Sequence, residues 1–308
     1  FFFKQKTAYE IKECDWSSDV CSSDLTTARR AKKSSAGYDL TRLFVGAEGT
    51  LGVITEITLR LSGIPEAISA GICPFPTVKA ACDATILTIQ SGLPVARIEL
   101  ADEWQVKAFN LHSNLSLPET PMLFVEFHGT DQGVKEQAER FGDIAVEFGG
   151  GPFEWATKPE DRTRLWQARH DAYWSALSLR PGCKVIATDV CVPISRLAEC
   201  VVETQKDVQA TGLTAPIVGH VGDGNFHLTL LCDMDDAQEV ETCRAFLHRL
   251  VERSLAMEGT CTGEHGVGQE KMKYLLKEHP PATLEAMRAI KQALDPQNIM
   301  NPGKIVAV

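Results

Sequence analysis

The sequence lacks the runs and motifs that define several large classes of protein. No apolar run reaches the roughly 18 residues that a membrane-spanning helix needs, so no transmembrane segment is expected. No long run of Lys or Arg occurs, and acidic residues outnumber basic ones by 41 to 31, for a net charge of −10. This balance argues against nucleic acid as a partner, whereas a small anionic substrate stays compatible with a few local cations.

The ten cysteines of the chain include no CxxC pair. A zinc ribbon or a cysteine-ligated iron–sulfur cluster is therefore unsupported. Because no secretory signal is recognisable, we expect the thiols to stay reduced in a cytosol-like compartment. A GxGxxG turn that opens a helix is also missing, which argues against a nicotinamide-binding Rossmann unit.

The first 25 residues, FFFKQKTAYEIKECDWSSDVCSSDL, differ from the rest of the chain. They have neither the basic nor the apolar region of a signal peptide, and no clear helix or strand period. They resemble the translated sequencing-adapter read-through found at the ends of some open reading frames. We therefore expect residues 1–25, with Cys14 and Cys21, to be a disordered artefact, and the true start of the protein to be missing.

Beyond this leader, strands and helices are expected to alternate. Residues 39–61 are typical of a helix, a glycine turn and a strand, and residues 66–150 predict three strands, each followed by a helix. The later elements expected are a helix (160–179), a strand (183–193), a helix (194–212), a hairpin (215–233), a helix (236–259) and a last helix (281–294). This order predicts an α+β sandwich of ferredoxin-like repeats, with helices on one face of a mainly antiparallel sheet.

The stretch GHVGDGNFHL, residues 219–228, places His220 and His227 around a glycine-rich turn. Its glycines let the backbone turn sharply and approach a neighbour closely. The two imidazoles could be metal ligands, bases, or merely polar residues at strand ends. The local spacing alone favours ordinary hydrogen-bonded histidines.

A second stretch, GEHGVG at 263–268, sets Glu264 and His265 between glycines in a non-helical loop. Together with His220 and His227, Glu264 would complete a set of two imidazoles and one carboxylate. Such a set leaves positions on a metal open for water or substrate, as in catalytic sites. His265 cannot easily share a metal with its immediate neighbour, which leaves it available as a base.

Two weaker signals accompany these histidines. Arg169 and Lys184 lie fifteen residues apart and could converge on an anion, although spacing alone favours two solvated cations. In GAEGTLGVITE, the glycines at 46, 49 and 52 make a loop whose backbone could lie against a flat or phosphorylated ligand. A lone glycine-rich turn is a weak signal.

Taken together, the motifs resemble a known family. FVGAEGTLGVITEITLRL, GHVGDGNFHL, GEHGVG and LDPQNIMNPGKI occur in that order from about Asp39 to the C-terminus. The set is similar to the FAD-linked oxidases of the vanillyl-alcohol-oxidase type, in the D-2-hydroxy acid dehydrogenase branch. That branch includes cytochrome-type D-lactate dehydrogenase, the glycolate oxidase FAD subunit and D-2-hydroxyglutarate dehydrogenase. The resemblance implies that residues 26–64 end a PCMH-type FAD-binding domain and residues 65–308 form the C-terminal substrate, or cap, domain.

The resemblance also implies roles for individual residues. FAD would lie near Glu48, Gly49, Gly52, Ile54 and Asn301. A divalent metal, Zn²⁺ or Mn²⁺, would be held by His220, His227 and Glu264. Substrate would be bound by Arg169, Lys184 and Thr229, and His265 would be the base.

These roles imply oxidation of a D-2-hydroxy acid, with D-lactate favoured, to the 2-oxo acid. In this scheme a metal on the hydroxyl oxygen would lower its pKa, His265 would accept the proton, and the hydride of C2 would pass to flavin N5. The hydroxyglutarate branch commonly has Asn at the position of Thr229, so the threonine favours a short monocarboxylate. D-2-hydroxyglutarate and glycolate remain alternative substrates.

The lobe that cradles the FAD pyrophosphate in this family does not occur in the sequence, so we expect the chain by itself to hold FAD weakly. The expected partners are the substrate and an electron acceptor (a cytochrome, a quinone or an electron-transfer flavoprotein), and the family also allows a homodimer. The expected location is cytoplasmic or peripheral at the inner membrane, mitochondrial in a eukaryote. Two other classes stay open. A zinc hydrolase using the same ligands leaves the flavin-related motifs unexplained, and the paired Arg169 and Lys184 argue mildly against a silent metal-binding or assembly domain.

Overall fold

The computed structural model describes residues 11–15, 25–156 and 159–308. These residues form two compact units. We call Pro65–Gly263 the sheet unit, and we call the residues up to Ile64 together with Glu264–Val308 the discontinuous unit. The first boundary follows Ile64, where the sequence analysis also separates two domains. The residues after Gly263, which the sequence analysis assigned to the cap domain, pack with the first segment of the chain in this division into compact units.

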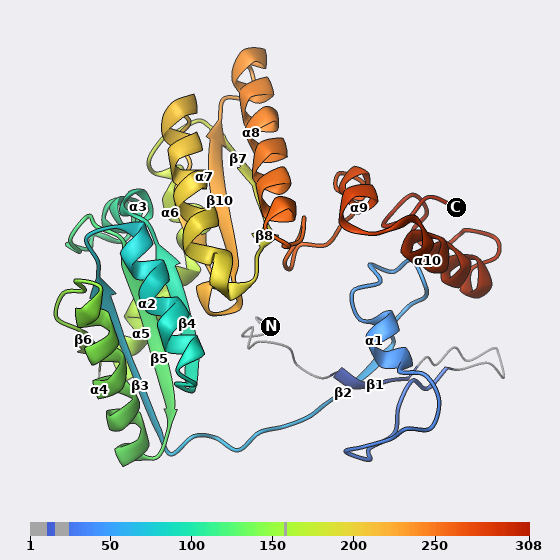
Figure 1. The fold of residues 1–308 in the computed structure, drawn as a ribbon, viewed down its shortest axis with the longest axis horizontal. Coiled ribbons are helices and arrows are strands. Elements are labelled where there is room, and N and C mark those ends of the chain that lie inside the picture. The colour runs from blue at the N-terminus through green and yellow to red at the C-terminus, as the bar shows by residue number, and fades with distance from the viewer. Residues whose placement is uncertain (1–10, 16–24, 157–158) are drawn as a thin grey trace. The chain divides into compact units, whose positions relative to one another are not determined.

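The sheet unit consists of two ferredoxin-like repeats that share one antiparallel sheet (Figure 1). The strands run in the order β6-β3-β5-β4-β9-β10-β7, with β8 paired to β10, and β4 and β9 join the two repeats. The first repeat contains β3 (Ala67–Pro74), α2 (Val78–Gln90), β4 (Val95–Ala101), β5 (Met122–Gly129), α4 (Asp131–Glu147) and β6 (Glu154–Ala156). The second contains β7 (Lys184–Ala187), β8 (Val190–Cys191), η1 (Ile194–Arg196), α7 (Leu197–Thr211), β9 (Ile217–Gly219), η2 (Val221–Asp223), β10 (Asn225–Cys232) and α8 (Ala237–Ala256).

Helices cover both faces of this sheet. The repeat helices α2, α4, α7 and α8 pack on one face, as predicted (Figure 1). The other face is covered by α3 (Glu103–Ser113), α5 (Pro159–His170) and α6 (Ala172–Leu177). The predicted α+β class with an antiparallel sheet is therefore confirmed, but the restriction of helices to one face is not. These three helices are insertions, one between β4 and β5 and two between β6 and β7, where the repeat itself needs only connections.

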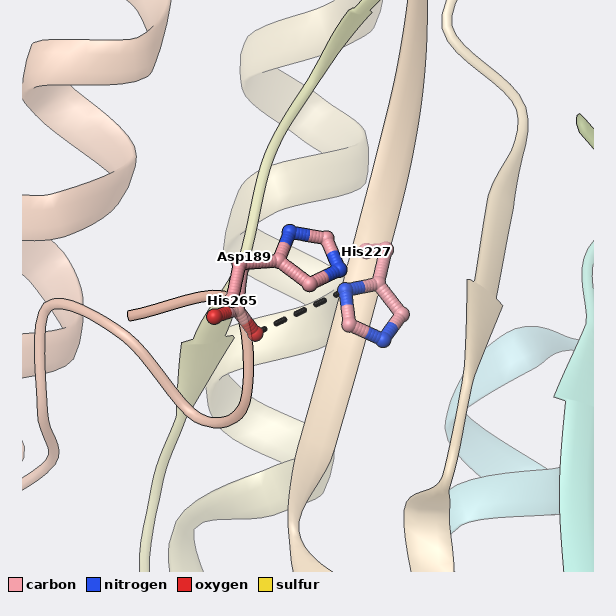
Figure 2. A group of neighbouring side chains, drawn as sticks. All are labelled: Asp189, His227 and His265. Carbon is pink, nitrogen blue, oxygen red and sulfur yellow. Dashed lines mark ion pairs between the residues drawn. The ribbon is translucent and has the colours of Figure 1, made fainter. Parts of the chain in front are cut away.

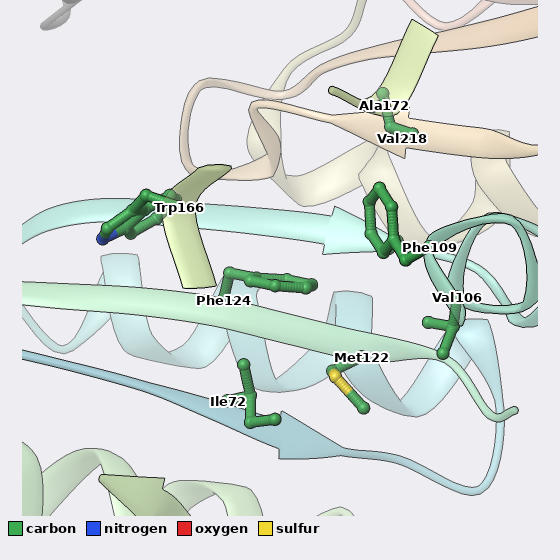
Figure 3. Close-up of a cluster of buried hydrophobic side chains, with 9 residues drawn as sticks. Ile72, Val106, Phe109, Met122, Phe124, Trp166, Ala172 and Val218 are labelled. Atoms are coloured by element: carbon green, nitrogen blue, oxygen red, sulfur yellow. The ribbon is translucent and has the colours of Figure 1, made fainter. Parts of the chain in front are cut away.

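A cluster of apolar side chains fills the space between the sheet and the inserted helices (Figure 3). Phe109 of α3 meets Phe124 of β5 edge-to-face with ring centroids 5.9 Å apart, and Phe124 also packs near Trp166 of α5. Alternate residues of β4 and β5 point to this face, so the same face also receives Glu99 and Glu126. Two buried carboxylates thus lie beside an apolar core, where each needs a partner.

Two predicted elements are interrupted in the structure. The helix expected over 160–179 divides at Asp171 into α5 and α6, and the strand expected over 183–193 divides at Thr188 and Asp189 into β7 and β8. In the second case Thr188 still donates its amide to the Leu228 carbonyl at 3.0 Å, but the return bond, from the Leu228 amide, goes to its hydroxyl. Asp189 bonds to Asn225 of β10 through its side chain. The pattern of apolar and polar residues does not reveal such breaks, because it continues unchanged on both sides of each break.

The discontinuous unit is made from segments at both ends of the chain. Its elements are β1 (Ile11–Asp15), α1 (Leu40–Phe44), β2 (Glu56–Leu59), α9 (Met272–Glu278) and α10 (Pro281–Leu294). β1 pairs antiparallel with β2, so the expectation of a leader without secondary structure is wrong for residues 11–15. Residues 1–10 and 16–24 of the leader lie outside the described residues. The sequence IKECD has no clear strand period, so this strand depends on its pairing with β2.

A buried lysine links the two segments of this unit. Lys291 of α10 forms an ion pair with Asp295 and donates hydrogen bonds to the carbonyls of Thr50 and Met300, each 2.8 Å away. The hydrogen bond from Lys291 holds the pKa of Asp295 below its ordinary value. Asp295 also accepts from the amides of Ile299 and Met300, which shapes the turn that begins the NPGK stretch. Among the described residues, no helix is both long and apolar enough to cross a membrane.

Candidate functional site

The structure brings His220 and His227 together, as the metal hypothesis requires. His220 follows β9, and His227 is the third residue of β10. The two strands pair antiparallel, and the imidazole rings lie edge-to-face with centroids 5.7 Å apart. Two glycines make this turn possible. A Cβ at Gly219 would lie 2.7 Å from the Asn225 carbonyl oxygen, and one at Gly224, where φ is +78°, would lie 2.1 Å from the Val192 carbonyl oxygen.

The tautomer of His227 is set by the break between β7 and β8. The amide of Leu228 donates to the Thr188 hydroxyl at 2.8 Å, and the Thr188 carbonyl lies 3.2 Å from His227 Nδ1. A carbonyl only accepts hydrogen bonds, so Nδ1 donates the proton. In the neutral ring, Nε2 is then the nitrogen with the lone pair, which is the form that binds a metal.

His220 has an equivalent arrangement with a different partner. Its Nδ1 lies 2.8 Å from Oε1 of Glu99, and the other carboxylate oxygen of Glu99 accepts from Nη2 of Arg169 at 2.9 Å. Burial raises the pKa of Glu99, but the Arg169 guanidinium and the hydrogen bond to His220 outweigh that effect, so the pKa lies below its ordinary value. The ionised carboxylate accepts from Nδ1, and His220 also presents Nε2 as the lone-pair nitrogen.

A buried polar network centred on Asp189 lies beside His227. A carboxylate oxygen of Asp189 lies 3.6 Å from His227 Nδ1, the contact marked in Figure 2. Its oxygens accept from Asn225 Nδ2 at 2.9 Å and from the Thr262 hydroxyl at 2.7 Å. A Cβ at Gly263 would lie 2.1 Å from Asn225 Nδ2, so the main chain of residue 263 packs directly on this network. The glycine that opens the GEHGVG stretch is therefore needed for a close approach.

The residues proposed for substrate binding divide into two groups. Thr229 lies two residues after His227 on the same face of β10, and Arg169 is joined to His220 through Glu99. Lys184 pairs with Cys232 in the register of β7 and β10, five positions along β10 from His227 and hence about 17 Å away. The residue across from Thr229 is Ala187. The structure therefore brings Arg169 and Thr229 to the histidines but not Lys184.

The discontinuous unit brings the other three motifs together. The carboxylate of Glu48 accepts from the amide of Val267 at 2.6 Å and from that of Gly268 at 2.9 Å. Asn301 Nδ2 donates to the Glu48 carbonyl at 2.6 Å. A Cβ at Gly266, where φ is +85°, would lie 2.7 Å from the Glu48 carboxylate, so only glycine fits there.

Glu48 therefore has a definite structural role, as the acceptor that shapes the loop after His265. Gly49 packs next to Asn301, since a Cβ at Gly49 would lie 4.0 Å from the Asn301 Cβ. Ile54 is partly exposed, and Gly52 lies in the same loop between α1 and β2. The residues expected near FAD thus share one unit, and the Glu48 side chain points to the backbone of 267–268.

We predict that Glu48→Ala loosens this loop without unfolding the unit. Hydrogen bonds to a charged group contribute about 1.5–3 kcal/mol, so the exchange of the Val267 and Gly268 amides with solvent should accelerate roughly 10- to 100-fold. Hydrogen exchange read by NMR or mass spectrometry measures this directly. Glu270→Gln, an exposed carboxylate in the same loop region, is the control. Unchanged exchange at both amides in Glu48→Ala would contradict the clamp.

Glu99 and Asp189 are the residues that the sequence reasoning missed. Glu99 lies 121 positions from His220 in the sequence and stands in a strand whose pattern otherwise looks ordinary. One signal was available: a charged pair, Arg97 and Glu99, on alternate positions of a strand expected to be half-buried. Asp189 lies in the strand predicted over 183–193, where Asp is unusual, and so it could have indicated the break between β7 and β8.

Comparison with known proteins identifies the family to which this chain belongs. The family model for FAD linked oxidases, C-terminal domain, matches residues 64–305. The chain is 51% identical to a protein of Danio rerio named Probable D-lactate dehydrogenase, mitochondrial, over 90% of this chain and 56% of that protein. It is 47% identical to D-lactate dehydrogenase [cytochrome], mitochondrial, of Arabidopsis thaliana, over 91% of this chain and 49% of that protein.

A solved structure shares the fold. The 4-ethylphenol oxidase of Gulosibacter chungangensis, in its isoeugenol complex, superposes with a TM-score of 0.74 at 14% identity, over 98% of this chain and 66% of that one. This likeness shows that the two chains share a fold. The chain belongs to the FAD linked oxidase family, through its C-terminal domain. It spans about half the length of the curated relatives that it matches.

Proposed function

We propose that the whole protein to which this chain belongs is an FAD-dependent dehydrogenase that oxidises D-lactate, or a similarly short D-2-hydroxy acid, to the 2-oxo acid. The observation on which this rests is the meeting of His220 and His227, each with Nδ1 already bonded, in a chain of the FAD linked oxidase family. The names of the two curated relatives support the choice of D-lactate. FAD, when bound, accepts the two electrons and the hydrogen of C2.

We propose His220, His227 and Glu264 as ligands of one divalent cation, Zn²⁺ or Mn²⁺. The donor chemistry fits, because both imidazoles direct Nε2 as the lone-pair nitrogen and a carboxylate completes a set typical of catalytic sites. Gly263 packs on Asn225, two residues before His227. Glu264 is the next residue after Gly263, and consecutive Cα atoms lie about 3.8 Å apart. The backbone of Glu264 therefore starts one residue from this contact. A cation, when bound there, would lower the pKa of the substrate hydroxyl.

We propose His265 as the base and Arg169 as the residue that binds the substrate carboxylate. His265 follows a metal ligand directly and is followed by Gly266, whose φ of +85° turns the chain beneath Glu48. Arg169 has five guanidinium donors and uses Nη2 for Glu99, while its buried Nε has no hydrogen-bond partner among the described residues. Thr229, on the His227 face of β10, is a small neighbour that suits a short side chain on the substrate.

Lys184 is not included in this proposal. Its register position places it about 17 Å from His227 along β10, beyond the reach of a shared small substrate.

For FAD, we propose the loop that contains Glu48, Gly49, Gly52 and Ile54, with Asn301 beside it, as the contribution of this chain. A cytochrome-type electron acceptor is proposed from the Arabidopsis thaliana relative, and reduction of cytochrome c by the full-length enzyme is the assay.

The absorption spectrum of the full-length protein tests the proposal. We expect a flavin band at roughly 450 nm, a wavelength set by the cofactor itself, which bleaches under anaerobic conditions on addition of D-lactate. D-lactate, glycolate and D-2-hydroxyglutarate should be compared by stopped flow, with D-lactate expected to reduce the flavin fastest. A protein that purifies with a metal but without the flavin band would overturn the dehydrogenase and favour a metal-dependent hydrolase.

A further inference from the structure

Glu99 is a buried carboxylate placed between two residues that the proposed function uses. It is 8% exposed, and it binds His220 through one oxygen and Arg169 through the other, at 2.8 and 2.9 Å. The three residues come from separate elements: β4, the turn after β9, and α5. The contact therefore depends on the tertiary fold of the sheet unit alone.

The register of the sheet explains why this carboxylate reaches His220. β4 pairs with β9 so that Leu100 lies across from Gly219 and Ala101 across from Val218. One step farther along the same antiparallel register, Glu99 lies across from His220. Helix α5 packs over this face of the sheet and presents Arg169 to the same carboxylate.

The two hydrogen bonds have consequences for both neighbours. A histidine that donates Nδ1–H to a carboxylate is held in one tautomer and one ring orientation, with Nε2 available to a metal. An arginine held by one carboxylate oxygen keeps its fork in a fixed plane, which suits bidentate binding of a second carboxylate. Both effects require that each carboxylate oxygen of Glu99 accepts one hydrogen bond.

A second carboxylate on the same face offers a natural comparison. Glu126 of β5 is 4% exposed and lies between His128, at 2.8 Å, and Arg97, at 3.5 Å. It therefore has the same chemistry as Glu99, an acid between a histidine and an arginine. The difference is that neither of its partners is among the residues assigned to the metal or the substrate.

We propose that Glu99 is a positioning residue that orients the metal ligand His220 and the substrate-binding Arg169 at the same time. The inference rests on the proposed function, since it assigns both partners from that function. Glu99 touches neither the substrate nor the cofactor in this scheme. It acts by linking the orientation of the cation ligand His220 to the orientation of Arg169, which binds the substrate carboxylate.

Glu99→Gln in the full-length enzyme tests the inference. A glutamine has one acceptor oxygen and one NH₂ group, so it cannot accept from both His220 and Arg169. We expect the Mn²⁺ affinity, measured by EPR titration, to fall roughly 10- to 100-fold, as for other partners of metal-bound histidines. The KM for D-lactate should also rise. Glu99→Asp retains two acceptor oxygens on a shorter side chain and should recover part of both properties.

Glu126→Gln is the matched control, and it should leave Mn²⁺ affinity and KM within about threefold of wild type. Thermal unfolding of each variant checks that the sheet unit is folded. If wild-type enzyme binds Mn²⁺ and Glu99→Gln binds it equally tightly, this inference is overturned while the proposed function stands. An equal loss in Glu126→Gln would also overturn it, because the effect would not be specific to Glu99. Absence of Mn²⁺ binding by the wild type would overturn both the cation site and the inference.

Discussion

Replacing His265 with asparagine should slow the reduction of the flavin by D-lactate by roughly 10²- to 10⁴-fold, the usual contribution of a general base. Asparagine keeps a polar side chain of similar size but cannot accept the hydroxyl proton near neutral pH. The metal should be retained, because the proposed ligands are His220, His227 and Glu264. Stopped-flow absorbance at the flavin band measures the rate, and elemental analysis measures the metal.

His279→Asn is the matched control for this substitution. His279 is partly exposed, as is His265, and each lies beside the glutamate that precedes it, at 4.0 Å from Glu278 and 3.8 Å from Glu264. The control should reduce the flavin at the wild-type rate. Reduction at the wild-type rate by His265→Asn would remove His265 from the mechanism. Loss of the metal in the same variant would instead assign it to the cation site.

The second large effect is expected for His227→Ala. This change removes one of the two imidazoles proposed as metal ligands and leaves the Thr188 carbonyl and Asp189 without their shared donor. Mn²⁺ affinity should fall by more than the roughly 10- to 100-fold expected for a partner of a ligand, and D-lactate oxidation should fall with it. Flavin content should stay close to wild type, since none of the residues proposed to lie near FAD is changed.

His128→Ala separates loss of a ligand from loss of a buried histidine. His128 is also largely buried and lies on the same sheet. It contacts the carboxylate of Glu126, as His227 contacts that of Asp189. Its removal should cost stability but leave Mn²⁺ affinity unchanged. Equal Mn²⁺ affinity in wild type and His227→Ala would contradict the cation site as proposed.

The local structure of this chain could be predicted from its sequence. Strands β3, β4 and β5 begin and end close to their predicted bounds, because period-2 and period-3.6 patterns and the capping residues act over a few positions. The short strand β6 was not predicted. Thr77, Asp102 and Thr130 each accept the amide hydrogen bond expected of an N-cap. The hairpin with His220 and His227 was likewise predictable, since glycines and polar residues between two apolar runs define a turn.

Only the tertiary structure decided which distant residues meet. Glu99 reaches His220 across 121 positions because antiparallel register fixes which residues face one another, and no local pattern encodes that register. The same reason separates Lys184 from His227 although both stand in neighbouring strands. Packing also joined Glu48 to the amides of Val267 and Gly268 and so placed the last segment of the chain with the first. The sequence by itself determined most of the elements, the motifs and the family. The long-range hydrogen bonds of buried charges, which must find partners wherever the fold supplies them, decided how the site is supported.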